Sequence, residues 1–62
     1  MNFDEAVTLE IDKQIRSLEE QLSQGSMKSF EDYKSVCGQI QGLLVARRIT
    51  QDLANRMKDH DD

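Results

Sequence analysis

Two adjacent arginines, Arg47 and Arg48, are the residues of this 62-residue sequence best suited to bind a charged group. A guanidinium group is planar and carries a fork of N–H donors that matches carboxylates and phosphates. Both arginines interrupt an apolar segment, so their aliphatic stems can cover a core while the charges reach solvent. In one interpretation they pair with Glu19, Glu20 or Asp12 of a neighbouring chain. In the other, several copies together form a site for a phosphate-bearing ligand or an acidic partner.

Tyr33 and Lys34 are the second candidate for contact with a partner, and Phe30 lies one helical turn before them. An aromatic side chain supplies a large apolar surface, and the tyrosine hydroxyl can still reach water. We expect Phe30 and Tyr33 to close one end of a helical bundle. The alternative is an exposed platform on which another molecule stacks.

No set of residues matches a catalytic or metal-binding pattern. Cys37 is the only cysteine and His60 the only histidine, and His60 belongs to a polar tail far along the chain, which disfavours a catalytic Cys–His pair. The aspartates around His60 lack the fixed geometry that metals require. The sequence also has no glycine-rich phosphate loop and no zinc-ligand spacing. We therefore expect no enzymatic activity, no metal and no cofactor, with Cys37 serving as a small apolar core residue.

The elements that position these residues are predicted by helical periodicity. Steps of three or four separate the apolar residues of the first half, which are Phe3, Val7, Ile11, Ile15, Leu18 and Leu22. This spacing places them on one face of a helix over residues 3–24. Asn2 and Glu5 have the spacing of a capping box, and Gly25 suits the left-handed position that ends a helix.

A second helix is predicted over residues 30–57, after a turn at residues 25–29. Ser29 is a good N-cap for this helix, and residues 58–62 form a polar tail that we expect to fray. A connection this short makes the two helices antiparallel neighbours. The expected fold is all-α, a single antiparallel two-helix hairpin whose longer second helix overhangs the first.

The second helix carries more apolar surface than one neighbouring helix can cover. Its apolar positions between residues 40 and 49 already span a wide arc, and Val45 widens it further. Two helices also bury too little surface to offset the conformational entropy lost on folding. We therefore expect homo-oligomers, either a helical bundle or a ring.

Three small residues, Gly38, Gly42 and Ala46, lie four apart along this helix. Glycine in the middle of a helix costs about 1 kcal/mol relative to alanine, so a close approach of another backbone would explain its use. We interpret the three as a helix-packing site, either within the hairpin or between protomers. The alternative is that a ligand or a foreign chain lies against the bare backbone.

Charge and hydropathy exclude two classes of partner. The formal net charge is -4, and an acidic chain repels phosphate backbones, which disfavours nucleic-acid binding. The longest unbroken apolar run covers residues 43–46, far short of the roughly 20 residues that span a bilayer. We expect no membrane partner.

Residues 29–34 (SFEDYK), 36–38 (VCG), 40–43 (IQGL) and 46–49 (ARRI) carry a resemblance to a known group. The run resembles very short helical-hairpin proteins of tailed bacteriophages, which are often encoded near virion genes. Their pattern has a SYEEY-type turn, then GxIxGLxxA and a basic pair. The resemblance covers residues 11–53, and Cys37 stands where a plain apolar residue is expected.

This resemblance implies a small virion structural or head-associated protein, found in the virion or the host cytoplasm. It would dock on a larger phage protein, such as a ring or shell, and the resemblance assigns no catalytic residues. A second hypothesis is a counter-defence protein that inhibits a host factor or sequesters a nucleotide signal. A third is a helical adaptor that regulates a host enzyme.

Overall fold

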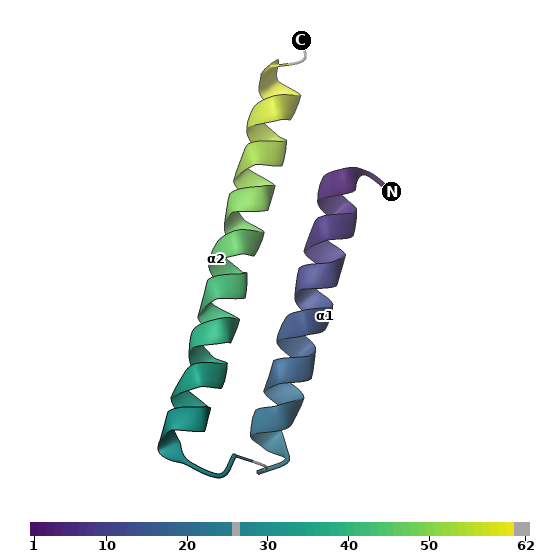
Figure 1. Ribbon diagram of the computed structural model, residues 1–62. Coiled ribbons are helices and arrows are strands. Elements are labelled where there is room, and N and C mark those ends of the chain that lie inside the picture. The colour runs from purple at the N-terminus through teal and green to yellow at the C-terminus, as the bar shows by residue number, and fades with distance from the viewer. Residues whose placement is uncertain (26, 61–62) are drawn as a thin grey trace.

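Two α-helices account for nearly all of the chain. The computed structural model describes residues 1–25 and 27–60, and these ranges contain α1 (Phe3–Ser23), α2 (Phe30–His60) and no strand. The helices lie side by side and antiparallel, joined by a short turn (Figure 1). The expected all-α hairpin is confirmed.

α1 begins after Asn2, as predicted, but the Asn2 side chain does not make the predicted capping hydrogen bond. Asn2 is extended, with φ -78° and ψ 162°, and its carbonyl oxygen accepts a hydrogen bond from the Ala6 N–H at 3.0 Å. Its side chain makes no hydrogen bond to the helix backbone. The amide Nδ2 donates to Glu5 Oε1 at 3.5 Å instead, so the predicted capping box is wrong. Asp4 and Glu5 place negative charge in the first turn, where the helix dipole favours it.

The end of α1 depends on the backbone conformation of Gly25. The Gln24 N–H donates to the Glu20 carbonyl at 3.0 Å and the Gly25 N–H to the Leu22 carbonyl at 3.3 Å. Gly25 has φ +67°, which only glycine adopts without strain. No atom lies within 4 Å of the position of an added Cβ, so the conformation and not the space selects glycine. The predicted termination of the first helix is confirmed.

The turn leads into α2 through Ser29, while residue 26 lies outside the described residues. The Ser29 hydroxyl accepts a hydrogen bond from the Asp32 N–H at 3.1 Å, so Ser29 caps the helix as predicted. The helix continues through His60, three residues beyond the predicted end at Met57. Residues 58–60 contain no glycine or proline that would stop the helix, which explains why this part of the tail extends it. Residues 61 and 62 of the predicted tail lie outside the described residues.

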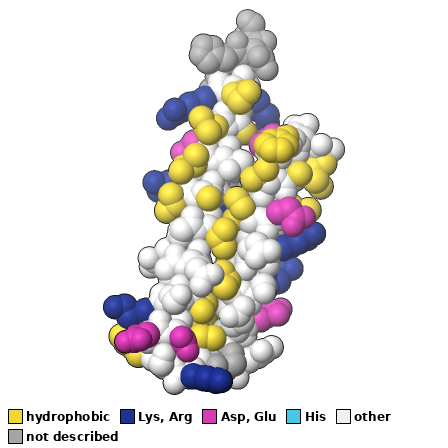
Figure 2. Space-filling view, viewed as in Figure 1, with side chains coloured by type: hydrophobic (Ala, Val, Ile, Leu, Met, Phe, Trp, Pro, Cys, Tyr) yellow, Lys and Arg dark blue, Asp and Glu magenta, His cyan; other side chains and the backbone are white. Residues whose placement is uncertain are grey.

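The core is a narrow seam between α1 and α2. Ile15 and Val36 are the buried hydrophobic residues among those described, with 8% and 7% of their surface exposed. Their neighbours along the seam are only partly covered, because each helix has a single partner. A continuous line of hydrophobic side chains marks the seam in Figure 2.

The hairpin is long and thin. It measures 52 × 19 × 11 Å, and its radius of gyration is 14.9 Å, against about 10.6 Å for a compact domain of this length. α2 has 31 residues and α1 has 21, and α2 runs past the start of α1 (Figure 1). The predicted overhang is therefore present. In the part of the chain that the structure describes, neither helix is long and apolar enough to cross a membrane.

A core this small makes single buried residues decisive. We expect Ile15→Ala to lower the free energy of unfolding by about 2–4 kcal/mol, through lost apolar burial and a residual cavity. Leu9→Ala, at a position of α1 that is 44% exposed, is the matched control and should cost at most about 1 kcal/mol. Urea unfolding followed by circular dichroism measures both changes. Equal effects of the two substitutions would show that the seam is not the core.

Candidate interaction surface on α2

Arg47 pairs with an acidic side chain of its own chain. Its Nη1 lies 2.5 Å from Asp12 Oδ1, and the two side chains are 36% and 40% exposed. The pair therefore bridges α2 and α1 at the edge of the seam. Asp12 was among the partners expected on a neighbouring chain, and the structure pairs it with Arg47 of its own chain instead. Pairing of Arg48 with a neighbouring chain stays a prediction. The antiparallel arrangement brings residues 12 and 47 to the same level along the hairpin. The charge of Arg47 is therefore paired within its own chain, and a second copy of the chain is not required for this.

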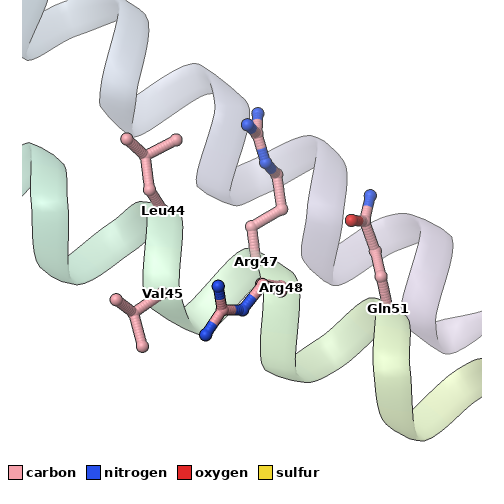
Figure 3. Close-up of a pocket in the computed structure, with 5 residues that line it drawn as sticks. All are labelled: Leu44, Val45, Arg47, Arg48 and Gln51. Atoms are coloured by element: carbon pink, nitrogen blue, oxygen red, sulfur yellow. The ribbon is translucent and has the colours of Figure 1, made fainter.

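Arg48 is exposed and makes no ion pair with any described residue. Figure 3 shows Arg47 directed toward α1 and Arg48 lying near Val45. Together with Leu44 and Gln51 they line a shallow hollow of about 370 Å³. Because Arg47 is paired with Asp12, one chain offers a single unpaired guanidinium group here. A two-arginine anion site is not formed within one hairpin.

Phe30, Tyr33 and Lys34 form an exposed cluster at the start of α2. The two rings are stacked, with centroids 6.2 Å apart and an interplanar angle of 21°, and Lys34 Nζ lies 5.7 Å from the Phe30 ring centre. Phe30 is 71% exposed and Tyr33 48%. The expectation that both rings close the end of a bundle is therefore not met within the hairpin. Among the described residues, α1 is the only helix that packs against α2. It covers the stripe of α2 that contains Val36, and it leaves the two aromatic rings exposed.

Cys37 lies one turn after Tyr33 and is only partly buried, with its thiol free. The expected role as a core residue is thus met only in part. The pKa of Tyr33 is raised above 10.0, and the main cause is a hydrogen-bonding interaction with the Cys37 side chain. The electrostatic interaction with Cys37 is the second cause, and burial is the third.

The two glycines of α2 do not mark a contact with α1. Gly38 and Gly42 are exposed, and a Cβ added to either would meet no atom within 4 Å. Ala46 is partly buried, and its carbonyl accepts a hydrogen bond from the Thr50 hydroxyl at 2.9 Å. A close crossing within the hairpin was one of the predicted explanations, and it is wrong for Gly38 and Gly42. A crossing between protomers, and a ligand or foreign chain against the bare backbone, stay predictions.

An apolar ridge runs along the second half of α2. We use the name "α2 ridge" for four residues spaced four apart, each at least half exposed: Val45 (52%), Ile49 (53%), Leu53 (52%) and Met57 (67%). Figure 2 shows hydrophobic side chains continuing along this part of α2. Residues four apart lie nearly above one another on a helix, so the ridge is one continuous surface. The predicted excess of apolar surface on the second helix is present.

A groove at the open end of the hairpin adds to this surface, and sequence reasoning missed it. Its volume is about 450 Å³, and its lining includes Phe3 and Val7 of α1 with Leu53, Ala54 and Met57 of α2. Phe3 is 86% exposed. The sequence did contain a signal for this groove. Phe3 is the first apolar residue of the helical repeat in α1, and it lies at the end of the hairpin where α2 extends beyond α1.

The predicted site residues do not converge on one place. Tyr33 and Lys34 lie at one end of α2, and Arg47 and Arg48 lie about 20 Å further along the same helix. Within the described ranges no polar side chain is buried, and no group of three or more metal-ligating residues occurs. The dominant feature is an extended apolar surface, which suits contact with another protein. In comparisons with protein-family models, curated proteins and solved structures, nothing matched this chain.

The Arg47–Asp12 pair should contribute little to stability but be measurable. In a double-mutant cycle of Arg47→Gln and Asp12→Asn, we expect a coupling free energy of about 0–1 kcal/mol, since both groups are partly solvated. The coupling should shrink in high salt. Arg48→Gln paired with Asp12→Asn is the control and should show no coupling. Equal coupling free energies in the two cycles would contradict a specific ion pair between Arg47 and Asp12.

Replacing Cys37 should change the titration of Tyr33. With Cys37→Ala, the hydrogen-bonding and electrostatic interactions with Cys37 are both lost, so the pKa of Tyr33 should fall toward its ordinary value. Tyrosinate absorbance reports this directly, because Tyr33 is the only tyrosine and there is no tryptophan. Ser35→Ala, at an exposed position two residues away, is the control. An unchanged titration in Cys37→Ala would mean that the two side chains do not interact.

Proposed function

We propose that this protein is a non-enzymatic assembly protein, a small structural component of a tailed bacteriophage that acts through oligomeric helix packing. Its partners are copies of itself and a larger phage protein that forms a ring or shell. The observation that carries the proposal is the α2 ridge, which presents apolar side chains along the second half of one helix and leaves each of them at least half exposed.

The physical argument starts from the cost of exposed apolar surface. Burial contributes about 25 cal/mol per Å², so a ridge of four large side chains favours association with a complementary surface. Isolated exposed apolar residues are normal on a protein, but a continuous row with an adjoining groove is typical of an interface. The groove that contains Phe3 and Met57 extends the same surface to the end of the hairpin.

The phage assignment is supported by the resemblance of residues 11–53 to short phage hairpin proteins. A counter-defence role by nucleotide sequestration has less support from the geometry. Such a role favours several converging cations, and at the hollow lined by Arg47 and Arg48 the first is paired with Asp12, which leaves Arg48 as the unpaired guanidinium group there. Inhibition of a host factor through the α2 ridge would use the same surface as a virion role. The two roles are therefore distinguished by whether the protein is found in the virion.

The first expected result is assembly through the α2 ridge. At micromolar concentration the chain should give a light-scattering mass of at least twice 7.1 kDa. Ile49→Glu should shift the protein to the monomer, because it places a charge in the buried interface. Gln51→Glu adds the same group about 200° around the helix and should leave assembly unchanged. A monomer of the unmodified chain that unfolds cooperatively would rule out the proposed function.

The virion role is tested separately, by mass spectrometry of purified phage particles from cells infected with a phage that encodes this chain. The peptide should be present in particles carrying the original sequence and depleted when Ile49→Glu is introduced. Assembly in solution with no peptide in particles would favour the counter-defence role.

A further inference from the structure

The hairpin exposes much more surface than a compact protein of its size. A compact 7.1 kDa protein is expected to expose about 4,100 Å², whereas this chain exposes 5137 Å². The excess of about 1,000 Å² exceeds the roughly 800 Å² that each partner buries in a stable protein–protein interface. One hairpin therefore has enough surplus surface to form a complete interface with another molecule.

The α2 ridge shares its face of the helix with the two glycines. At 100° per residue, Gly38, Gly42, Ile49 and Leu53 fall within an arc of about 60°. The first half of this face is therefore flat at Gly38 and Gly42, and the second half carries the large side chains of Ile49 and Leu53. Both glycines have open space where a side chain would lie, so α1 does not explain them.

We propose that a second copy of the chain packs antiparallel across this face of α2, with Gly42 opposite Ile49 of the second copy and Gly38 opposite Leu53. This inference rests on the assembly part of the proposed function and specifies its geometry. The two-fold axis passes between residues 45 and 46, so the flat half of each helix receives the large side chains of the other. Both glycine contacts occur twice, and the backbones approach closely without any void.

The charges on this face also favour the antiparallel arrangement. Arg56 and Glu31 are exposed and lie on the same side of α2 as the ridge. With the axis between residues 45 and 46, Arg56 lies opposite residue 35 of the second copy, one turn from its Glu31. An arginine side chain spans that distance, so two Arg56–Glu31 pairs form. A parallel arrangement would place Arg56 beside Arg56, which is repulsive.

Disulfide trapping tests the geometry directly. All chains carry Cys37→Ser, and a mixture of Gly42→Cys and Ile49→Cys chains is oxidised at micromolar concentration. We expect the mixed dimer to form at least ten times faster than the dimer of Gly42→Cys alone. The control is a mixture of Gln41→Cys and Gln51→Cys chains, whose positions are centred on nearly the same point of α2 but lie outside the proposed contact face. It should cross-link no faster than unassociated chains.

Two further sets of variants keep the test informative if a cysteine perturbs the interface. Gly42→Leu should raise the dimer dissociation constant at least tenfold, whereas Gln41→Leu should leave it within about threefold, although leucine favours the helix at both positions. Glu31→Arg and Arg56→Glu should each raise the constant, and the two together should restore it because the pair is reversed.

The outcomes separate this inference from the proposed function. A monomeric chain overturns both. A dimer in which Gly42→Cys links mainly to itself is parallel, and a dimer trapped equally by the control pair uses another face. Either result overturns the antiparallel geometry and leaves the proposed assembly role standing. Gly42→Leu that binds as tightly as Gln41→Leu would also overturn it.

Discussion

The packing of α1 against α2 along a single narrow stripe is the interaction on which the rest of the structure depends. Each helix packs against one other helix, so burial is restricted to the residues that face the seam. Among the described residues, only Ile15 and Val36 are covered to the level of an ordinary core. All other apolar residues of α2 are left in contact with water to some degree. The elongated shape of the molecule and the apolar surface that it leaves exposed both follow from this limit.

The seam also decides which charged groups are available for binding. Arg47 lies at its edge, where the antiparallel register places Asp12 within reach, and the pair ties the two helices together. Arg48 is the next residue, 100° further around the helix, and it points away from the seam. Adjacent residues of one type thus have different roles, because the helix turns one toward α1 and the other toward solvent.

The exposed surface of α2 is divided by the same geometry. The side that faces α1 supplies the core, and the α2 ridge with Gly38 and Gly42 lies about 120° away from it. The stacked rings of Phe30 and Tyr33 occupy the end near the turn and remain accessible. α2 therefore has one face that forms the fold and another that leaves apolar side chains exposed.

The sequence alone determined both helices, the cap at Ser29 and the termination at Gly25, because these depend on local spacing and backbone conformation. It also indicated that α2 carries more apolar surface than α1 can cover. Only the tertiary structure decided that Arg47 pairs within its own chain and that Gly38 and Gly42 face open space. Both depend on which residues of the two helices lie at the same level and on the rotation of each helix about its axis. Periodicity defines the apolar face of a helix, but the relative register is set by side-chain packing across the seam.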